Sequence, residues 1–164
     1  LRFFMSLGLN VAGEIVGLVV VDHGSKKAAA NEMLVDVARM FKRVSGVAIV
    51  EPAHMELCDP TIEQAFDRCV GQGATLVIIH PYFLSPGRHS TTDIPTLAAA
   101  AAARHRGVKF HVTQPLGLDD KIAAVMVERI GHCVQSEFSC GYCAGTGCAG
   151  NAARKGECQM TPVK

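Results

Sequence analysis

Segments typical of β-strands alternate with segments typical of α-helices along this chain of 164 residues, and this alternation limits the possible folds more than any other feature. Strands are expected at 15–22, 47–50, 76–79 and 108–112, and helices at 28–44, 61–70, 92–106 and 119–133. The first strand is a β-branched run of the kind that is buried on both faces. Strands that alternate with helices of this length form parallel sheets with right-handed crossovers. The sequence therefore predicts an α/β fold with three layers and a parallel sheet of about four strands.

Several helix boundaries and one helix face can also be predicted. Gly46 is expected to end the first helix, Asp59 with Pro60 to begin the second, and Asp119 or Asp120 to cap the fourth. The apolar residues of the first helix recur at helical spacing and are expected to face the core: Met33, Val37, Met40, Phe41 and Val44.

Composition excludes several functional classes. The 16 Lys and Arg residues nearly cancel the 15 Asp and Glu residues, so no broad positive field favours nucleic acid. The 49% of hydrophobic residues and 19% of charged residues are typical of a globular protein. The longest strongly apolar run, at 15–21, is far shorter than the roughly 20 residues of a membrane-spanning helix.

Three regions are expected from changes in composition. Residues 1–14 form an N-terminal extension, because the first 13 contain Arg2 and Ser6 but no acidic residue, as in the remnant of a transit peptide or in a shortened chain. Residues 15–133 contain all the alternating elements and form one domain. Residues 134–164 are rich in Gly, Ala, Cys and Ser and are expected to form a flexible tail.

Residues that can carry chemistry follow the strands, at the edge where open parallel sheets bind ligands. His23 and Gly24 follow the first strand, His54 and Glu56 the second, and His80 the third, with His89 at the end of the loop after it. Imidazoles and a carboxylate at one edge suit a divalent transition metal. A structural role is expected for His80, and the role of His54 is left open between a structural residue and a ligand. Other residues are expected at the surface (His105, His111 and His132) or as small buried hydrophobes (Cys58 and Cys69).

Five strings together resemble the short sirohydrochlorin chelatases, which are class II chelatases. They are V-V-D-H-G-S at 20–25, M-E-L-C-D-P-T-I at 55–62, G-A-T-L-V-I-I-H-P-Y-F-L-S-P-G-R-H at 73–89, D-I-P at 93–95 and P-L-G-L-D at 115–119. The resemblance covers about 16–132 in order. One departure is Cys58-Asp59, where the family more often has Ala-Glu.

The resemblance implies an enzyme that inserts Fe²⁺ into sirohydrochlorin to form siroheme. His23 and His89 would be metal ligands, and Glu56 a third ligand or the proton acceptor. The eight carboxylates of sirohydrochlorin require an anion-binding rim, for which the candidates are Ser25, Lys26, Lys27, Ser85, Gly87, Arg88 and Ser90. The same ligands permit a cobaltochelatase of cobalamin-type biosynthesis. A metal or tetrapyrrole carrier without catalysis is a third interpretation.

A cysteine-rich tail after one chelatase unit resembles the plastid form of plants and algae, which implies a chloroplast (stromal) enzyme with an iron–sulfur cluster. Longer relatives fuse two units, which implies a homodimer for the short form. The candidate ligands of a [2Fe–2S] cluster are Cys140, Cys143, Cys148 and Cys158, with Cys133 as the alternative fourth ligand. Zinc or a reversible disulfide would use the same thiols.

Overall fold

The computed structural model describes residue 9 and residues 11–135. The chain divides into two units at Gly117. The first contains four strands and three α-helices, and the second contains the helix α4 (Asp120–Gln135). Among the described residues, no helix is both long enough and apolar enough to cross a membrane.

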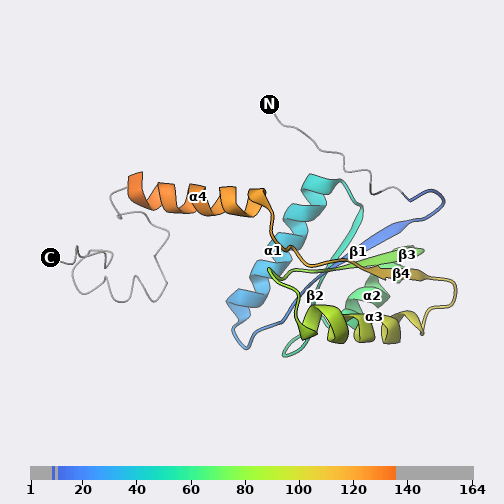
Figure 1. The fold of residues 1–164 in the computed structure, drawn as a ribbon. Helices are drawn as coiled ribbons and strands as arrows, with labels where there is room; N and C mark the ends of the chain where they lie inside the picture. The colour runs from blue at the N-terminus through green and yellow to red at the C-terminus, as the bar shows by residue number, and fades with distance from the viewer. Residues whose placement is uncertain (1–8, 10, 136–164) are drawn as a thin grey trace. The chain divides into compact units, whose positions relative to one another are not determined.

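One parallel sheet organises the first unit (Figure 1). Its strands are β1 (Val16–Asp22), β2 (Ile49–His54), β3 (Leu76–Pro81) and β4 (Lys109–Val112), in the spatial order β2-β1-β3-β4. All three neighbouring pairs are parallel. In the register of β1 with its two neighbours, Asp22 lies beside His54 of β2 and Val21 lies beside Pro81 of β3. The carboxyl ends of these three strands therefore meet at one edge. The predicted α/β architecture is confirmed.

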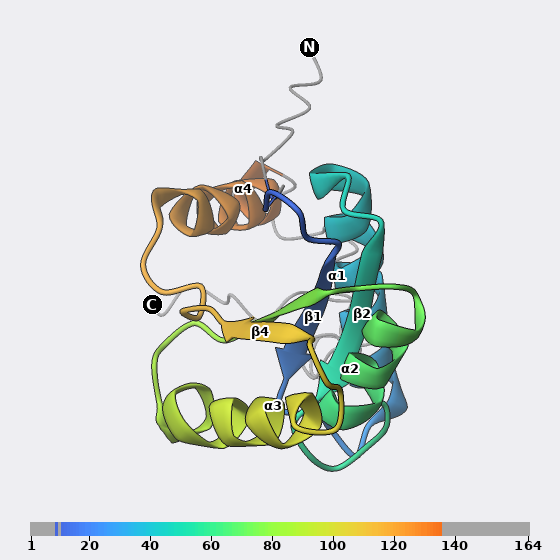
Figure 2. The same cartoon turned by 90° about the vertical axis from the view of Figure 1, so that its right-hand side faces the viewer.

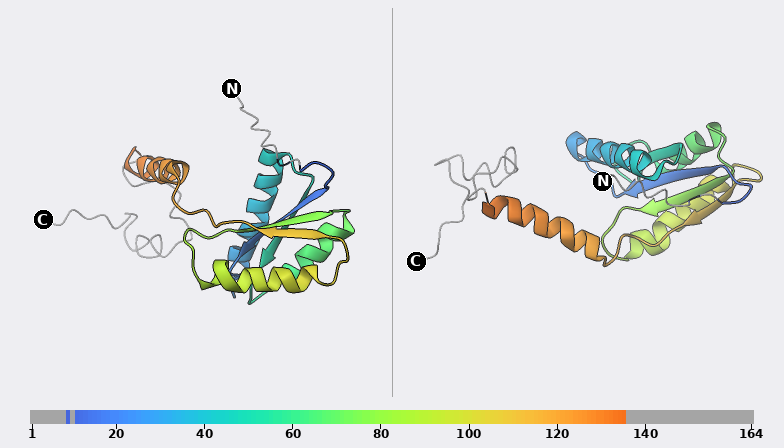
Figure 3. Two further views of the ribbon diagram at one scale, coloured as in Figure 1. Left: turned by 45° about the vertical axis from the view of Figure 1, so that its right-hand side comes forward. Right: turned by 90° about the horizontal axis from the view of Figure 1, so that it is seen from above.

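Helices cover both faces of the sheet. The helix α1 (Ala28–Ser45) packs Leu34 and Ala38 on Leu18 and Val20 of β1. On the other face, α2 (Ile62–Gly71) and α3 (Ile94–Ala102) pack on Val19 and Val21 around the fully buried Phe66. Figures 2 and 3 show α1 and α3 on opposite sides of the strands. The central strand β1 is thus buried on both faces, as predicted.

The second strand is longer than predicted. The expected end was Val50, but β2 continues to His54 through Pro52. Proline is tolerated here because β2 is an edge strand, where one row of N–H groups has no partner strand. His54 is therefore the last residue of the strand rather than part of the following loop.

The helices α2 and α4 begin at residues with side-chain caps. The predicted cap at Asp59 is wrong: Thr61 caps α2, and Thr61 and Gln64 form a reciprocal capping box. The Asp119 side chain accepts a hydrogen bond from the Lys121 N–H at the start of α4, so one of the two predicted caps is confirmed. Gly46 ends α1 in the left-handed conformation, as predicted.

Two further details differ from the expectations. In α1 the residues buried against β1 are Leu34 and Ala38. Of the residues predicted to face the core, Val37 and Phe41 pack against this cluster, whereas Met33, Met40 and Val44 are exposed. The expected loop that ends at His89 is shorter than predicted, and the expected helix at 92–106 has different bounds. A turn of π-helix, η1 (His89–Asp93), leads directly into α3, which ends at Ala102. His89 therefore lies on a helical turn.

Candidate active site

His23 and Glu56 lie in contact just beyond the ends of β1 and β2. The His23 Nε2 and the Glu56 Oε1 are 2.6 Å apart. The backbone aligns them, because the Met55 N–H donates to the Asp22 carbonyl and the Glu56 N–H to the His23 carbonyl. The parallel pairing of the two strands thus continues into their loops and brings the two side chains together.

Gly24 permits this close approach. Its φ is +86°, a left-handed conformation that side chains rarely adopt. A Cβ at this position would lie 2.1 Å from the Glu56 carbonyl oxygen. Only glycine therefore lets the His23 loop pack against the Glu56 loop.

His89 approaches the pair from the other side, on η1. The rings of His23 and His89 meet edge to face, with their centroids 5.2 Å apart. The His89 Nδ1 lies 2.9 Å from the Asp93 Oδ2, and since a carboxylate only accepts, this nitrogen carries the proton. The other ring nitrogen of His89, Nε2, is the atom through which it would bind a metal.

The three side chains are not assembled as a three-ligand site. In the part of the chain that the structure describes, no group of three His, Cys, Asp or Glu residues is placed so that it could hold a metal ion. The ligand roles expected of His23, Glu56 and His89 therefore stay predictions. The His23 Nε2 and the Glu56 Oε1 are in direct hydrogen-bond contact, whereas atoms that share one metal lie roughly 3 Å apart, given bonds of about 2.1 Å. A metal would have to replace the proton between them.

All three side chains can be reached from solvent. The exposed fractions are 42% for His23, 51% for Glu56 and 46% for His89. An ion or a macrocycle can therefore approach them without unfolding of the core.

The residues predicted to bind substrate carboxylates have different environments. Ser90 is buried, and its hydroxyl accepts the Gly87 N–H and donates to the Gly87 carbonyl. Ser90 therefore shapes the loop. The Ser25 hydroxyl accepts the Lys27 N–H ahead of α1. The side chains of Lys26, Lys27, Ser85 and Arg88 are exposed, and Arg88 lies 3.6 Å from Asp93. The exposed cations are those available to an anionic ligand.

The other histidines have structural contacts or lie at the surface. His54 is buried against Asp22, at 2.5 Å. His80 lies 2.7 Å from the Thr113 hydroxyl, and burial lowers its pKa. The surface prediction is wrong for His105, which is 22% exposed, stacks on Phe66 and contacts Asp67, whereas His111 and His132 are exposed. Among the cysteines, Cys69 is buried, which raises its pKa to about 12, and Cys58 is half-buried.

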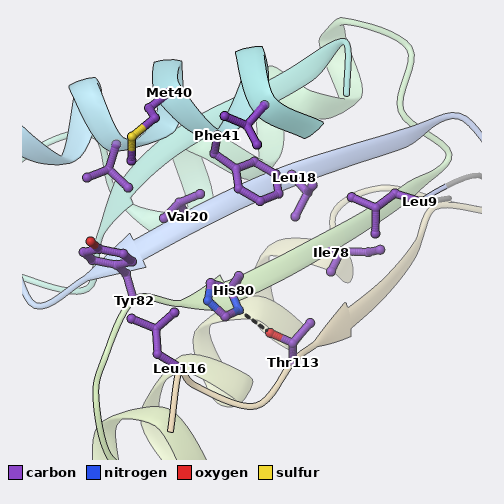
Figure 4. Close-up of a pocket in the computed structure, with 12 residues that line it drawn as sticks. Leu9, Leu18, Val20, Met40, Phe41, Ile78, His80, Tyr82, Thr113 and Leu116 are labelled. Carbon is purple, nitrogen blue, oxygen red and sulfur yellow. Dashed lines mark hydrogen bonds between the residues drawn. The ribbon is translucent and has the colours of Figure 1, made fainter. Parts of the chain in front are cut away.

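An apolar pocket of about 390 Å³ lies beside α1 on the sheet (Figure 4). Leu18, Val20 and Ile78 form its floor, and Phe41 of α1 lies above them. His80 and Thr113 are its polar pair. Sequence reasoning did not predict this pocket, because it arises where two strands, one helix and the segment after β4 meet.

Sequence reasoning also assigned no role to Asp93 and Asp22, which contact His89 and His54. The spacing of four residues between His89 and Asp93 is the signal that could have identified the first pair. The predicted cluster ligands Cys140, Cys143, Cys148 and Cys158 lie outside the described residues.

Comparison with known proteins reveals relatives of this chain. The chloroplastic sirohydrochlorin ferrochelatase of Arabidopsis thaliana is 45% identical over 84% of this chain and 63% of its own length. The sirohydrochlorin cobaltochelatase of Methanocaldococcus jannaschii is 32% identical over 68% of this chain and 95% of its own length. The chain thus spans less than two thirds of the Arabidopsis protein but nearly all of the archaeal one.

A solved structure shares the fold. The cobalt complex of the sirohydrochlorin chelatase SirB from Bacillus subtilis subspecies spizizenii superposes with a TM-score of 0.67 and 29% identity, over 71% of this chain and 50% of that one. The CbiX family model matches residues 17–133, which contain the candidate site and all of the sheet except the first residue of β1. This chain therefore belongs to the CbiX family.

Proposed function

We propose that this protein inserts Fe²⁺ into sirohydrochlorin to form siroheme in the chloroplast. The observation that supports this most is the contact of 2.6 Å between His23 and Glu56, with the His89 ring beside it. Two imidazoles can receive the ion, and a carboxylate can receive a proton. The chloroplastic ferrochelatase relative supports both the metal and the compartment.

The reaction replaces two pyrrole N–H protons of the macrocycle with one divalent ion, so two protons are released for each metal inserted. The ion enters between the Nε2 of His89 and the Nε2 of His23, which gives up its hydrogen bond to Glu56. His23 can then place its proton on Nδ1, which lies 3.3 Å from the Gly24 carbonyl. Glu56, once released, accepts the pyrrole protons in turn and passes them to water.

The carboxylates of the substrate require cations near this edge. Arg88 is 86% exposed and adjacent to His89, and Lys26 lies on the loop that follows His23. Each of these cations is close in sequence to one of the proposed metal ligands. We propose that they orient the macrocycle by binding its carboxylates. Ser25, Ser85, Gly87 and Ser90 then shape the two loops on which these groups lie.

Cobalt is the alternative metal. The archaeal relative is a cobaltochelatase, and imidazole with carboxylate suits both ions. A carrier is the second alternative, since a carrier needs the ligands without a proton acceptor.

An anaerobic absorption assay tests this function. Sirohydrochlorin mixed with Fe²⁺ should lose its metal-free bands faster with the protein than without it, and more molecules than protein chains should be converted. Acceleration with Co²⁺ alone would favour the cobaltochelatase, and conversion that stops at one molecule per chain would favour a carrier. No acceleration with either metal would contradict the proposal.

Glu56→Gln is expected to reduce turnover by about 100-fold or more, because a positioned proton acceptor contributes roughly 10²–10⁴-fold. The amide keeps an oxygen and nearly the same shape, so the affinity for Co²⁺, used as a spectroscopic probe, should fall much less. Parallel measurement of rate and Co²⁺ affinity checks this. Equal losses of both would show that Glu56 is only a ligand.

A homodimer is also proposed. The chain corresponds to 50% of the Bacillus chelatase chain, so two copies would supply the mass of the longer form. The apolar pocket exposes Met40, Tyr82 and Leu116 on the first unit, and a second copy that covered them would remove this surface from water (Figure 4).

The tail is proposed to bind a [2Fe–2S] cluster through Cys140, Cys143, Cys148 and Cys158. Thiolates that hold a cluster cannot pass Fe²⁺ to the macrocycle, so the cluster is separate from insertion. Ending the chain after Gln135 should abolish iron–sulfur absorption and leave the insertion rate measurable. Complete loss of activity in a folded, shortened protein would show that the tail belongs to the active site.

A further inference from the structure

The buried His54 and the half-buried Asp22 form a polar pair beside the candidate site. The His54 side chain is 1% exposed, and its Nδ1 donates to the Asp22 Oδ1 at 2.5 Å. The same carboxylate oxygen accepts the Gly24 N–H at 2.9 Å. One oxygen atom therefore joins the end of β2 to the turn that follows His23.

The backbone of His54 extends this connection to the loop that carries Glu56. The His54 N–H donates to the Pro60 carbonyl at 2.7 Å, which closes the loop between the two residues. A Cβ on Gly24 would lie 3.2 Å from the His54 Cβ, so the His23 turn rests directly on His54. The ring of His54 thus lies where the His23 loop and the Glu56 loop meet.

The reacting side chains need such a support because they are about half exposed and lie on loops. A buried polar pair adds little net stability compared with apolar residues of the same volume. It does fix directions, since one hydrogen-bond geometry satisfies both partners. Stability alone therefore gives little reason to place this pair beneath His23 and Glu56.

We propose that Asp22 and His54 are positioning residues for metal insertion, and that their hydrogen bonds set the distance between His23 and Glu56. This inference rests on the function proposed above. Neither residue exchanges protons with the substrate or binds the metal. They act through Gly24 and through the loop of Glu56.

Two substitutions separate this role from packing. His54→Asn is smaller but keeps an N–H near the position of Nδ1, whereas His54→Leu keeps the volume but has no donor. The Leu variant should lose about 10–100-fold in kcat, as when an outer partner of a ligand is removed, with a KM for sirohydrochlorin within about twofold of the wild-type value. The Asn variant should recover most of the lost rate. Packing alone would give the opposite order.

His105→Leu is the matched control. It removes another histidine–aspartate contact, with Asp67 at 2.7 Å, between α2 and the end of α3. It should lower the melting temperature without changing kcat. If His54→Leu does not fold, Asp22→Ala and Asp22→Asn repeat the comparison, since only Asn keeps the acceptor for His54 and Gly24.

The proposal is overturned if the folded Leu variant keeps the wild-type kcat, or if the Asn variant is as slow as the Leu variant. Co²⁺ affinity distinguishes this failure from failure of the proposed function. If the wild-type protein inserts no metal, the proposed function is wrong. In that case, weaker Co²⁺ binding in the Leu variant but not in the Asn variant would still support the positioning role. Equal Co²⁺ affinity in both variants would then contradict it.

Discussion

His23→Ala and His89→Ala should each lower the rate of metal insertion by more than about 100-fold, because loss of an outer partner alone costs 10–100-fold and these residues contact the ion itself. Both side chains are about half exposed and lie outside the two core clusters, so the fold should persist. Anaerobic initial rates, with circular dichroism to confirm folding, measure this effect.

His111→Ala is the control for the two histidine variants. His111 is an exposed histidine on β4, within the strand rather than beyond its end. Its variant should insert metal at the wild-type rate. Near-normal rates in both His23→Ala and His89→Ala would show that the metal is received elsewhere.

Gly24→Ala should have the largest effect on stability of any single methyl addition in the first unit. The left-handed conformation costs a side chain about 1–2 kcal/mol, and the collision with the Glu56 carbonyl adds about 1–3 kcal/mol. Because relief of the collision must separate the His23 and Glu56 loops, activity should fall as well. Urea unfolding and the insertion rate measure both effects.

Gly46→Ala is the matched control for this substitution. Gly46 also has a positive φ, of +74°, but no atom lies within 4 Å of a Cβ placed there. Only the cost of the left-handed conformation, about 1–2 kcal/mol, should remain, without a change in rate. Equal effects of the two substitutions would show that the contact between Gly24 and Glu56 does not govern the site.

The alternation of elements could be predicted from the sequence because each strand and helix has its own local pattern. Boundaries were less predictable where tertiary contacts decide them. β2 passes through Pro52 because it is an edge strand, and strand order is not a local property. The helical turn at His89–Asp93 was missed because the preceding Pro and Gly residues indicate a loop.

The site followed from one topological rule, that loops after parallel strands share an edge. This rule brought several histidines and Glu56 to one edge, and the family resemblance selected His23, Glu56 and His89 among them. The structure places these three in contact or near it. It could not predict the hydrogen bond between His23 and Glu56 or the support by Asp22 and His54. These depend on register, on the φ of Gly24 and on rotamers, which residue spacing does not specify.

Titration of the full-length protein with Co²⁺, followed by its ligand-field absorption, tests most directly whether the metal is received at the sheet edge. The wild-type spectrum should show a component with nitrogen and oxygen ligands that disappears in the His23→Ala, His89→Ala double variant. Any component with thiolate ligands, from the cysteine-rich tail, should be unchanged. An identical nitrogen and oxygen component in the wild-type protein and the double variant would contradict the site.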